Sequence, residues 1–91
     1  MTYEERRREC HKVAEQLEKL LRQGRSLTFR KVHTILPLKP EREEWTPVSA
    51  SPLKVRVRWF KGEDLVFDDV RAVDCRDIRA YLLNDWQYEV K

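Results

Sequence analysis

The stretch LKVRVRWFKGEDLVF, residues 53–67, decides the fold class of this chain. Within residues 53–60 apolar and basic side chains alternate strictly, which is the period of a β-strand with two different sides. The apolar side carries Val55, Val57 and Trp59, and the basic side carries Lys54, Arg56 and Arg58. The letters KGED then provide a turn, and the apolar residues from Leu65 onward begin a return strand, so the stretch predicts a β-hairpin. The Asp68-Asp69 doublet interrupts the return strand, and we expect a bulge there.

The N-terminal quarter of the chain has the pattern of a long amphipathic helix over residues 3–23. Thr2 with Glu5 three residues later forms the T-x-x-E arrangement that begins many helices, and Gly24 is placed to end this one. Apolar residues recur at helical spacing in one stripe, made of Cys10, Val13, Ala14, Leu17, Leu20 and Leu21. We expect this stripe to pack on the core of the domain, with a contact to a partner helix as the alternative.

Residues 26–52 are harder to assign. In SLTFRKVHTIL, residues 26–36, the alternation of Leu27 and Phe29 favours a strand, although a short helix ended by Pro37 also fits. Residues 37–52 hold all four prolines, which predicts a Pro-rich loop rather than a strand at the centre of a sheet. Trp45 lies inside this expected loop, where it either covers the core or contacts a partner.

The last part of the chain predicts a short helix followed by a strand. Asp74 or Asp77 can cap the helix, Asn84 suits a left-handed residue at its end, and DWQYEV, residues 85–90, alternates like a strand. The expected fold is therefore α+β in a single domain over residues 1–91. A long N-terminal helix packs on a mainly antiparallel sheet of about four strands, and a short helix precedes the last strand.

Composition argues against several classes of function. With two Gly the chain can build neither a P-loop nor a dinucleotide-binding loop, and no serine lies in a nucleophile-elbow motif, so we expect no enzyme and no cofactor. Cys10, His11, His33 and Cys75 lack the close pairing of zinc ligands, so no metal site is expected. No apolar run is long enough to span a membrane, which predicts a cytoplasmic protein without a membrane partner.

The charge distribution points to an anionic partner. The formal net charge is +3, and residues 1–40 carry ten basic against five acidic side chains. Arginine suits phosphate groups because its guanidinium donates two parallel hydrogen bonds, and aromatic rings stack on bases. The candidate ligand-binding residues are Arg30, Arg56, Arg58 and Trp86, and the candidate partner contacts are Trp45 and Lys54. An entirely solvated charged surface is the alternative for the basic row.

Two segments resemble a family of small phage proteins. QLEKLLRQGRSLTFRK, residues 16–31, and DIRAYLLNDWQYE, residues 77–89, are similar to the opening and closing segments of the anti-Thoeris sponges, which sequester cyclic ADP-ribose-type signals. The match includes Asp77, Asp85 and Trp86, but the family's Trp after the first-strand Arg is absent, because RKVH follows Phe29.

The resemblance implies a non-enzymatic counter-defence protein in the host cytoplasm. Such a protein acts by sequestering an anionic nucleotide signal or by blocking a host defence protein. Because a chain of 91 residues has little concavity of its own, we also expect a homo-oligomer. Two alternatives stay open: a small basic, winged-helix-like nucleic-acid-binding module, and a protein-interaction subunit that uses the helical stripe.

Overall fold

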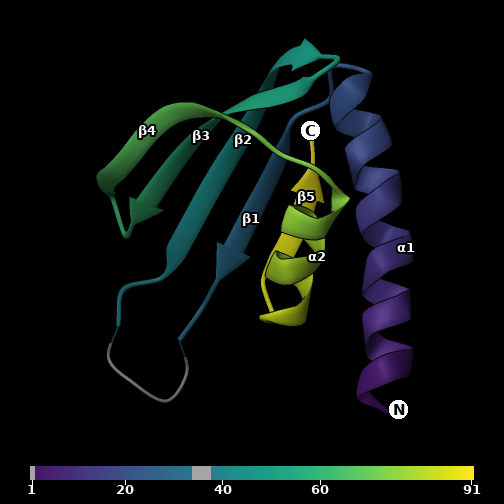
Figure 1. The fold of residues 1–91 in the computed structure, drawn as a ribbon. Coiled ribbons are helices and arrows are strands. Elements are labelled where there is room, and N and C mark those ends of the chain that lie inside the picture. Colours follow the sequence, from purple (N-terminus) through teal and green to yellow (C-terminus); the bar gives the residue numbers. More distant parts are fainter. Residues whose placement is uncertain (1, 34–37) are drawn as a thin grey trace.

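The computed structural model describes residues 2–33 and 38–91, and it confirms the α+β class (Figure 1). Within these residues the elements are α1 (Tyr3–Arg22), β1 (Leu27–Lys31), β2 (Glu41–Ala50), β3 (Leu53–Lys61), β4 (Asp64–Ala72), α2 (Cys75–Leu83) and β5 (Gln87–Val90). The five strands of the described residues form one antiparallel sheet in the order β4-β3-β2-β1-β5. Residues 34–37 of the ambiguous segment lie outside the described residues, and the expected strand is confirmed for Leu27–Lys31.

Helix α1 begins at the predicted residue, Tyr3, and ends at Arg22, one residue before the predicted end. The Thr2 hydroxyl accepts a hydrogen bond from the Glu5 amide at 3.2 Å, which satisfies one of the free N–H groups of the first turn. Gly24 follows the helix with φ of +89°, a left-handed conformation that glycine adopts without a Cβ penalty. Of the apolar stripe, Ala14, Leu17 and Leu21 are buried, so the stripe packs on the core.

Strand β2 corrects the expected Pro-rich loop at 37–52, since it occupies the centre of the sheet between β1 and β3. Its pairing with β3 shifts register between Pro47 and Ser49, and such an irregularity accommodates a residue that has no N–H to donate. The alternation of β2 is hidden in the sequence because its inward positions include Glu43, a buried carboxylate, beside the buried Trp45.

The β3–β4 hairpin has the expected alternation but not the expected bulge. Val55 and Val57 are buried, whereas Lys54 and Arg56 are exposed. The register shift lies between Trp59 and Phe60, and the Asp68-Asp69 doublet keeps regular pairing with β3. Asp68 stands opposite Arg58 in this pairing, and opposite charges across two strands stabilise the regular register.

The C-terminal segment adds a capped helix and an edge strand. Asp74 caps α2 by accepting from the Arg76 amide at 2.8 Å, and Asp77 accepts from the Asp74 amide at 2.8 Å. The left-handed residue after α2 is Asp85, with φ of 64°, whereas Asn84 has φ of −96°; this corrects the expected position by one residue. Strand β5 then pairs with β1, so the first and the last strand of the chain are neighbours in the sheet.

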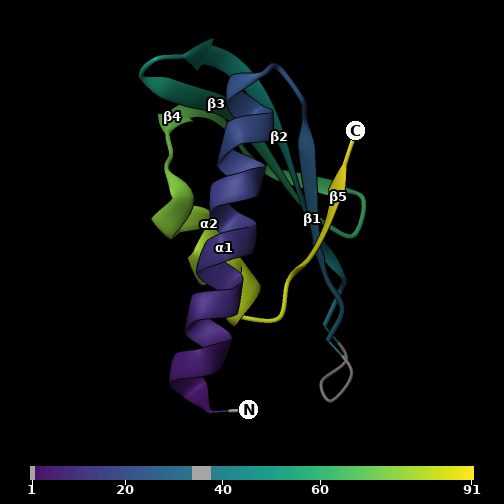
Figure 2. The same cartoon turned by 90° about the vertical axis from the view of Figure 1, so that its right-hand side faces the viewer.

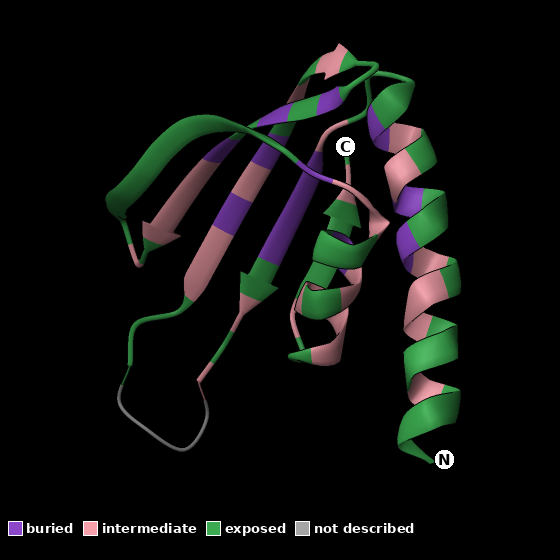
Figure 3. Cartoon of the chain, viewed as in Figure 1, coloured by how far each residue is buried: buried purple, intermediate pink, exposed green. Residues whose placement is uncertain are grey.

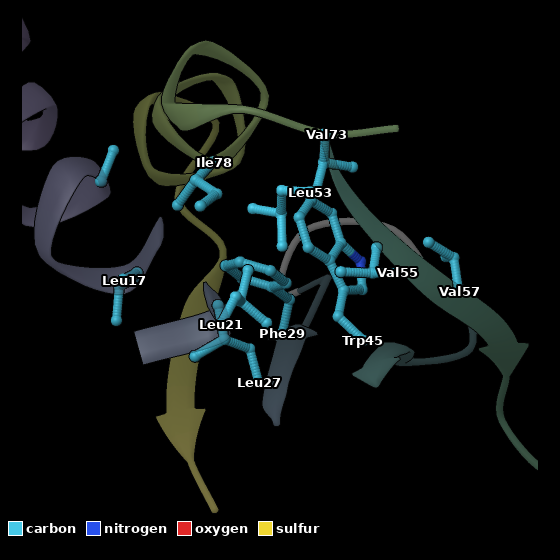
Figure 4. Packing of buried hydrophobic residues seen from close by; sticks show 11 residues of the cluster. Leu17, Leu21, Leu27, Phe29, Trp45, Leu53, Val55, Val57, Val73 and Ile78 are labelled. Atoms are coloured by element: carbon cyan, nitrogen blue, oxygen red, sulfur yellow. The ribbon is translucent and has the colours of Figure 1, made fainter. Parts of the chain in front are cut away.

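Both helices lie on the same side of the sheet (Figures 1 and 2). We call this side the inner face, and the opposite side the outer face. The buried hydrophobic residues gather between the inner face and the helices, with Trp45 and Phe29 as the largest fully buried side chains (Figures 3 and 4). No helix or strand among residues 2–33 and 38–91 covers the outer face, which carries Arg30, Arg42, Glu44, Lys54, Arg56, Arg58 and Phe60.

Candidate ligand-binding site

A pocket of about 320 Å³ opens on the inner face beside helix α2. Side chains from β2, β3, β4, α2 and the residue before β5 line it: Glu41, Glu43, Val57, Trp59, Phe67, Arg71, Tyr81 and Trp86. Half of these residues are aromatic, and three of them carry a charge. Small-ligand sites typically combine apolar walls with a few convergent polar groups, so this pocket is the candidate functional site.

The Glu43 carboxylate anchors the buried end of the pocket. Glu43 is only 7% exposed, and the Tyr81 hydroxyl lies 2.7 Å from each of its two carboxylate oxygens. The Trp45 indole N–H also donates to Glu43, at 3.2 Å. Burial first, and then the hydrogen bond to Glu43, raise the pKa of Tyr81 well above its ordinary value, so Tyr81 remains a neutral donor. This network holds α2 against β2 and fixes the position of the Tyr81 ring.

A second carboxylate, Glu41, lies two residues earlier on the same side of β2. Glu41 accepts a hydrogen bond from the Trp59 indole N–H at 3.2 Å, and its other oxygen lies 2.6 Å from His33 Nε2. The indole of Trp59 is therefore held by its N–H, which leaves its ring to form a wall of the pocket. Strand β2 thus presents two carboxylates, Glu41 and Glu43, and each of them holds an aromatic ring of the pocket by a hydrogen bond.

Aromatic rings and basic side chains complete the pocket and its surroundings. The rings of Tyr81 and Trp86 pack with centroids 5.2 Å apart. Lys31 Nζ lies 5.8 Å from the centre of the Trp86 ring, and Lys61 Nζ lies 5.0 Å from that of Trp59. Arg71, itself a lining residue, lies over Trp45. Three cations therefore lie beside two carboxylates, and a third carboxylate, Asp69, stands opposite Val57 on the same face, so the region combines charges of both signs.

This arrangement suits a ligand that combines a flat ring, N–H donors and an anionic group. Tryptophan rings stack on a flat ring, carboxylates accept hydrogen bonds from N–H donors, and the surrounding cations attract an anionic group. Among the described residues, no group of three His, Cys, Asp or Glu side chains is placed to hold a metal ion. The groups that line the pocket offer stacking, hydrogen bonding and charge to a ligand.

The candidate residues named from the sequence divide between the two faces of the sheet. Trp86 lines the inner pocket, whereas Arg30, Arg56 and Arg58 lie on the outer face, so the structure does not bring the four together. Arg56 donates two hydrogen bonds of 2.8 Å to Asp68, and this contact holds the pKa of Asp68 below its usual value. Lys54, a candidate partner contact, is also on the outer face and exposed.

Trp45, the other candidate partner contact, has none of its surface exposed, and it packs edge-on against Phe29 with ring centroids 4.9 Å apart. The structure thus corrects its expected placement in a loop. Of the pocket residues, only Trp86 was identified as a candidate from the sequence. Glu41 and Glu43 were missed because they lie in the segment expected to be a loop, and Tyr81 lies in the expected short helix, for which the sequence predicts no binding role. The signal that could have found them is the inward spacing of Glu41, Glu43 and Trp45 at period two.

Comparisons of the chain with family models, with curated proteins and with solved structures found no match. The resemblance of the two chain segments to the sponge family therefore stays a prediction. In the part of the chain that the structure describes, no helix is long and apolar enough to cross a membrane. Support for a function accordingly comes from the chemistry of the pocket and from the sequence pattern.

Proposed function

We propose that this protein is a non-enzymatic binding protein that captures a nucleotide-type small molecule in the inner-face pocket. The observation that carries the proposal is the placement of the Trp59 and Trp86 rings beside the carboxylate of Glu41, with cations around them. A nucleobase is a flat ring that carries N–H donors, and a nucleotide adds a phosphate. The ring, the N–H donors and the phosphate of such a ligand match the tryptophan rings, the carboxylates and the cations of the pocket, respectively.

A purely cationic ligand fits less well. Aromatic rings beside carboxylates attract cations, but Lys61 and Lys31 already lie over the rings of Trp59 and Trp86. A ligand of either kind has to move these lysines aside to stack on the rings, but an ammonium group is in addition repelled by them and by Arg71. An anionic group attached to an aromatic ring gains from the same three cations, which favours a nucleotide.

Capture without turnover is the mode of action that we propose. Glu43 already accepts hydrogen bonds from Tyr81 and Trp45, and Glu41 is engaged by Trp59 and His33, so both carboxylates position aromatic rings. The similarity of the two chain segments to the anti-Thoeris sponges makes a cyclic ADP-ribose-type nucleotide the first ligand to test. In that role the protein would lower the free concentration of a signal that a host defence system needs.

Isothermal titration calorimetry with ADP-ribose, cyclic ADP-ribose, AMP and ribose 5-phosphate tests the proposal. We expect binding of the compounds that contain a base, and little binding of ribose 5-phosphate, which has no ring to stack. Loss of one stacking ring costs about 1–3 kcal/mol, so Trp86→Ala should weaken binding by roughly 5- to 150-fold.

Tyr88→Ala is the matched control, because Tyr88 is a 46% exposed aromatic residue of β5 that does not line the pocket. This variant should bind the nucleotide as the unmodified protein does. Chromatography of the ligand after incubation should recover it unchanged. Absence of binding across the panel, or equal affinity in Trp86→Ala, would refute nucleotide capture in this pocket.

A further inference from the structure

A second pocket, of about 390 Å³, lies where the first half of α1 meets α2. The two helices pack against each other (Figures 1 and 2). The lining side chains of this pocket are Glu4, Arg7, Arg8, His11, Lys12, Glu15 and Arg79. Those from α1 follow one another at helical spacing, so they lie on one side of the helix. Four of the lining side chains are cations and two are carboxylates, which leaves an excess of positive charge.

The three arginines of this pocket have no acidic partner. In residues 2–33 and 38–91, Arg7, Arg8 and Arg79 take part in no ion pair. Their neighbour Arg6, in contrast, lies 2.6 Å from Asp85. Arg7 and Arg8 are also exposed, so an external group can reach them. Three guanidinium groups with unused donors therefore line one pocket, and an anion bound among them replaces their mutual repulsion with attraction.

The acidic side of the pocket holds Arg79 in place rather than neutralising it. Arg79 Nη1 lies 3.2 Å from His11 Nδ1, and because arginine only donates, this ring nitrogen accepts and the ring proton is on Nε2. His11 Nε2 lies 3.3 Å from Glu15 Oε1. Glu15 therefore orients the imidazole, and the imidazole orients Arg79 through one of its N–H donors. The remaining donors of Arg79 are available to a ligand.

We propose that this pocket binds a small ligand with a terminal diphosphate group, and that Arg7, Arg8 and Arg79 donate to its oxygens. Guanidinium groups match phosphate oxygens with pairs of parallel hydrogen bonds, and such charge-assisted bonds are stronger than neutral ones. Three guanidinium groups from two helices suit an anion with several oxygens on two neighbouring phosphorus atoms better than a single carboxylate. Lys12, which lies 3.7 Å from Glu9, adds a further positive charge.

The ligand of this pocket differs from that of the inner-face pocket. ADP-ribose has its diphosphate esterified at both ends, so it carries fewer negative charges than a terminal diphosphate. Because the two pockets share no residue, the diphosphate site does not depend on the nucleotide pocket. Free pyrophosphate and a nucleoside diphosphate such as ADP both carry the terminal group, so they share the chemistry that this pocket recognises.

Isothermal titration calorimetry with pyrophosphate, at constant ionic strength, tests the site. Arg7→Gln, Arg8→Gln and Arg79→Gln should each bind pyrophosphate about tenfold more weakly than the unmodified protein, since each loses charge-assisted hydrogen bonds. Lys19→Gln is the matched control and should keep full affinity, because Lys19 is an exposed cation of the same helix that does not line the pocket. Equal affinity in all five proteins, an equal loss in all four variants, or absence of binding would overturn the proposal.

Thermal unfolding separates loss of the site from loss of the fold. Because Arg7 and Arg8 are exposed, their glutamine variants should unfold without ligand at the Tm of the unmodified protein. Pyrophosphate should raise the Tm of the unmodified protein, and it should raise that of the two variants less. Inorganic phosphate should bind about tenfold more weakly than pyrophosphate, because it reaches fewer of the guanidinium groups. Equal affinity for the two anions would contradict a diphosphate site.

Titration of Trp86→Ala identifies the source of the diphosphate. This variant is altered in the nucleotide pocket alone, so it should bind pyrophosphate as the unmodified protein does. Tighter binding of ADP than of pyrophosphate would identify a nucleoside diphosphate as the ligand, and equal or weaker binding would identify free pyrophosphate. Either result supports the site when Arg7→Gln, introduced into Trp86→Ala, weakens binding of the same compound about tenfold.

Three outcomes of this titration would overturn the proposal. Loss of pyrophosphate binding in Trp86→Ala would place the anion in the inner-face pocket. Binding that Arg7→Gln leaves unchanged would place it away from α1. Tighter binding of oligothymidylate than of either small compound, with a steep dependence on salt, would indicate a surface for a polymer instead of a site for a diphosphate.

Discussion

Glu43 and Glu44 are neighbours in the sequence, but they lie on opposite faces of the sheet and differ in almost every physical respect. Glu43 is 7% exposed and accepts hydrogen bonds from Tyr81 and Trp45, whereas the side chain of Glu44 is 31% exposed and pairs with Arg42 on the same strand. A buried carboxylate is stable only when donors surround it, whereas an exposed one is solvated by water. The inner face therefore fixes its polar groups, while the outer face leaves them adjustable.

The largest expected effect comes from placing a charge on the inner face. Val55 is fully buried beside Trp45 and Leu53 (Figure 4), so Val55→Asp puts an unpaired carboxylate in the core. An unpaired buried charge costs several kcal/mol, which is comparable to the total stability of about 5–15 kcal/mol of a small domain. We expect Val55→Asp to abolish cooperative unfolding as followed by circular dichroism.

Lys54→Asp is the matched change on the outer face, one residue away on the same strand. Lys54 is exposed, and its replacement should leave the protein folded with a stability change within about 0.5 kcal/mol. If both variants unfold, or if both remain folded, the result would contradict the contrast between a buried inner face and a solvated outer face.

A smaller effect is expected from the two glutamates themselves. Glu43→Gln keeps the shape of the side chain but replaces one acceptor oxygen with an NH₂ group close to the Tyr81 hydroxyl and the Trp45 N–H. Leaving a buried donor unsatisfied costs about 1–3 kcal/mol, to be measured by urea denaturation. Glu44→Gln should change the free energy of unfolding by less than about 0.5 kcal/mol. Equal effects would indicate that the Glu43 network does not hold α2 on the sheet.

The smallest effect concerns acid unfolding on the outer face. The hydrogen bond from Arg56 lowers the pKa of Asp68 below its ordinary value of 3.8. The stabilisation is therefore present above about pH 4 and is lost as the pH falls through the lowered pKa of the folded state. Asp68→Asn should be slightly less stable than the unmodified protein at neutral pH, with the difference vanishing in acid.

Thermal unfolding across the acid range checks this prediction. Glu63→Gln, which removes an exposed carboxylate from the β3–β4 turn, is the control and should keep the acid dependence that Asp68 provides. A difference between Asp68→Asn and the unmodified protein that stays constant from neutral to strongly acidic pH would show that the Arg56–Asp68 contact does not act through charge.

The sequence alone predicts the elements in which apolar residues recur at a regular helical or strand spacing. The stripe of α1 and the alternation of residues 53–60 led to the α+β class, because each pattern leaves one side for the core. Strand β2 escaped prediction because its inward positions are Glu41, Glu43, Trp45 and Pro47, which do not form an apolar row. Its stability depends on pairing with β1 and β3, and the propensity of the segment alone does not record that pairing.

The candidate site was only partly predictable, for a related physical reason. Arg30, Arg56 and Arg58 share one side of their strands, and chemistry that suits phosphate was visible in their residue type. The pocket, in contrast, is assembled from β2, β3, β4, α2 and Trp86, and its carboxylates acquire their roles from Tyr81 and Trp59 across the fold. Hydrogen bonds between residues so far apart along the chain leave no pattern in a single sequence.

NMR observation of side-chain N–H groups during titration with ADP-ribose tests the central claim most directly. The indole N–H of Trp59 and that of Trp86 report on the inner pocket, and the Nε–H of Arg56, hydrogen-bonded to Asp68, reports on the outer face. The account predicts shifts of both indole resonances with the Arg56 resonance unchanged. Shifts of Arg56 with both indoles unchanged would contradict it, and would place the nucleotide on the arginine row of the outer face.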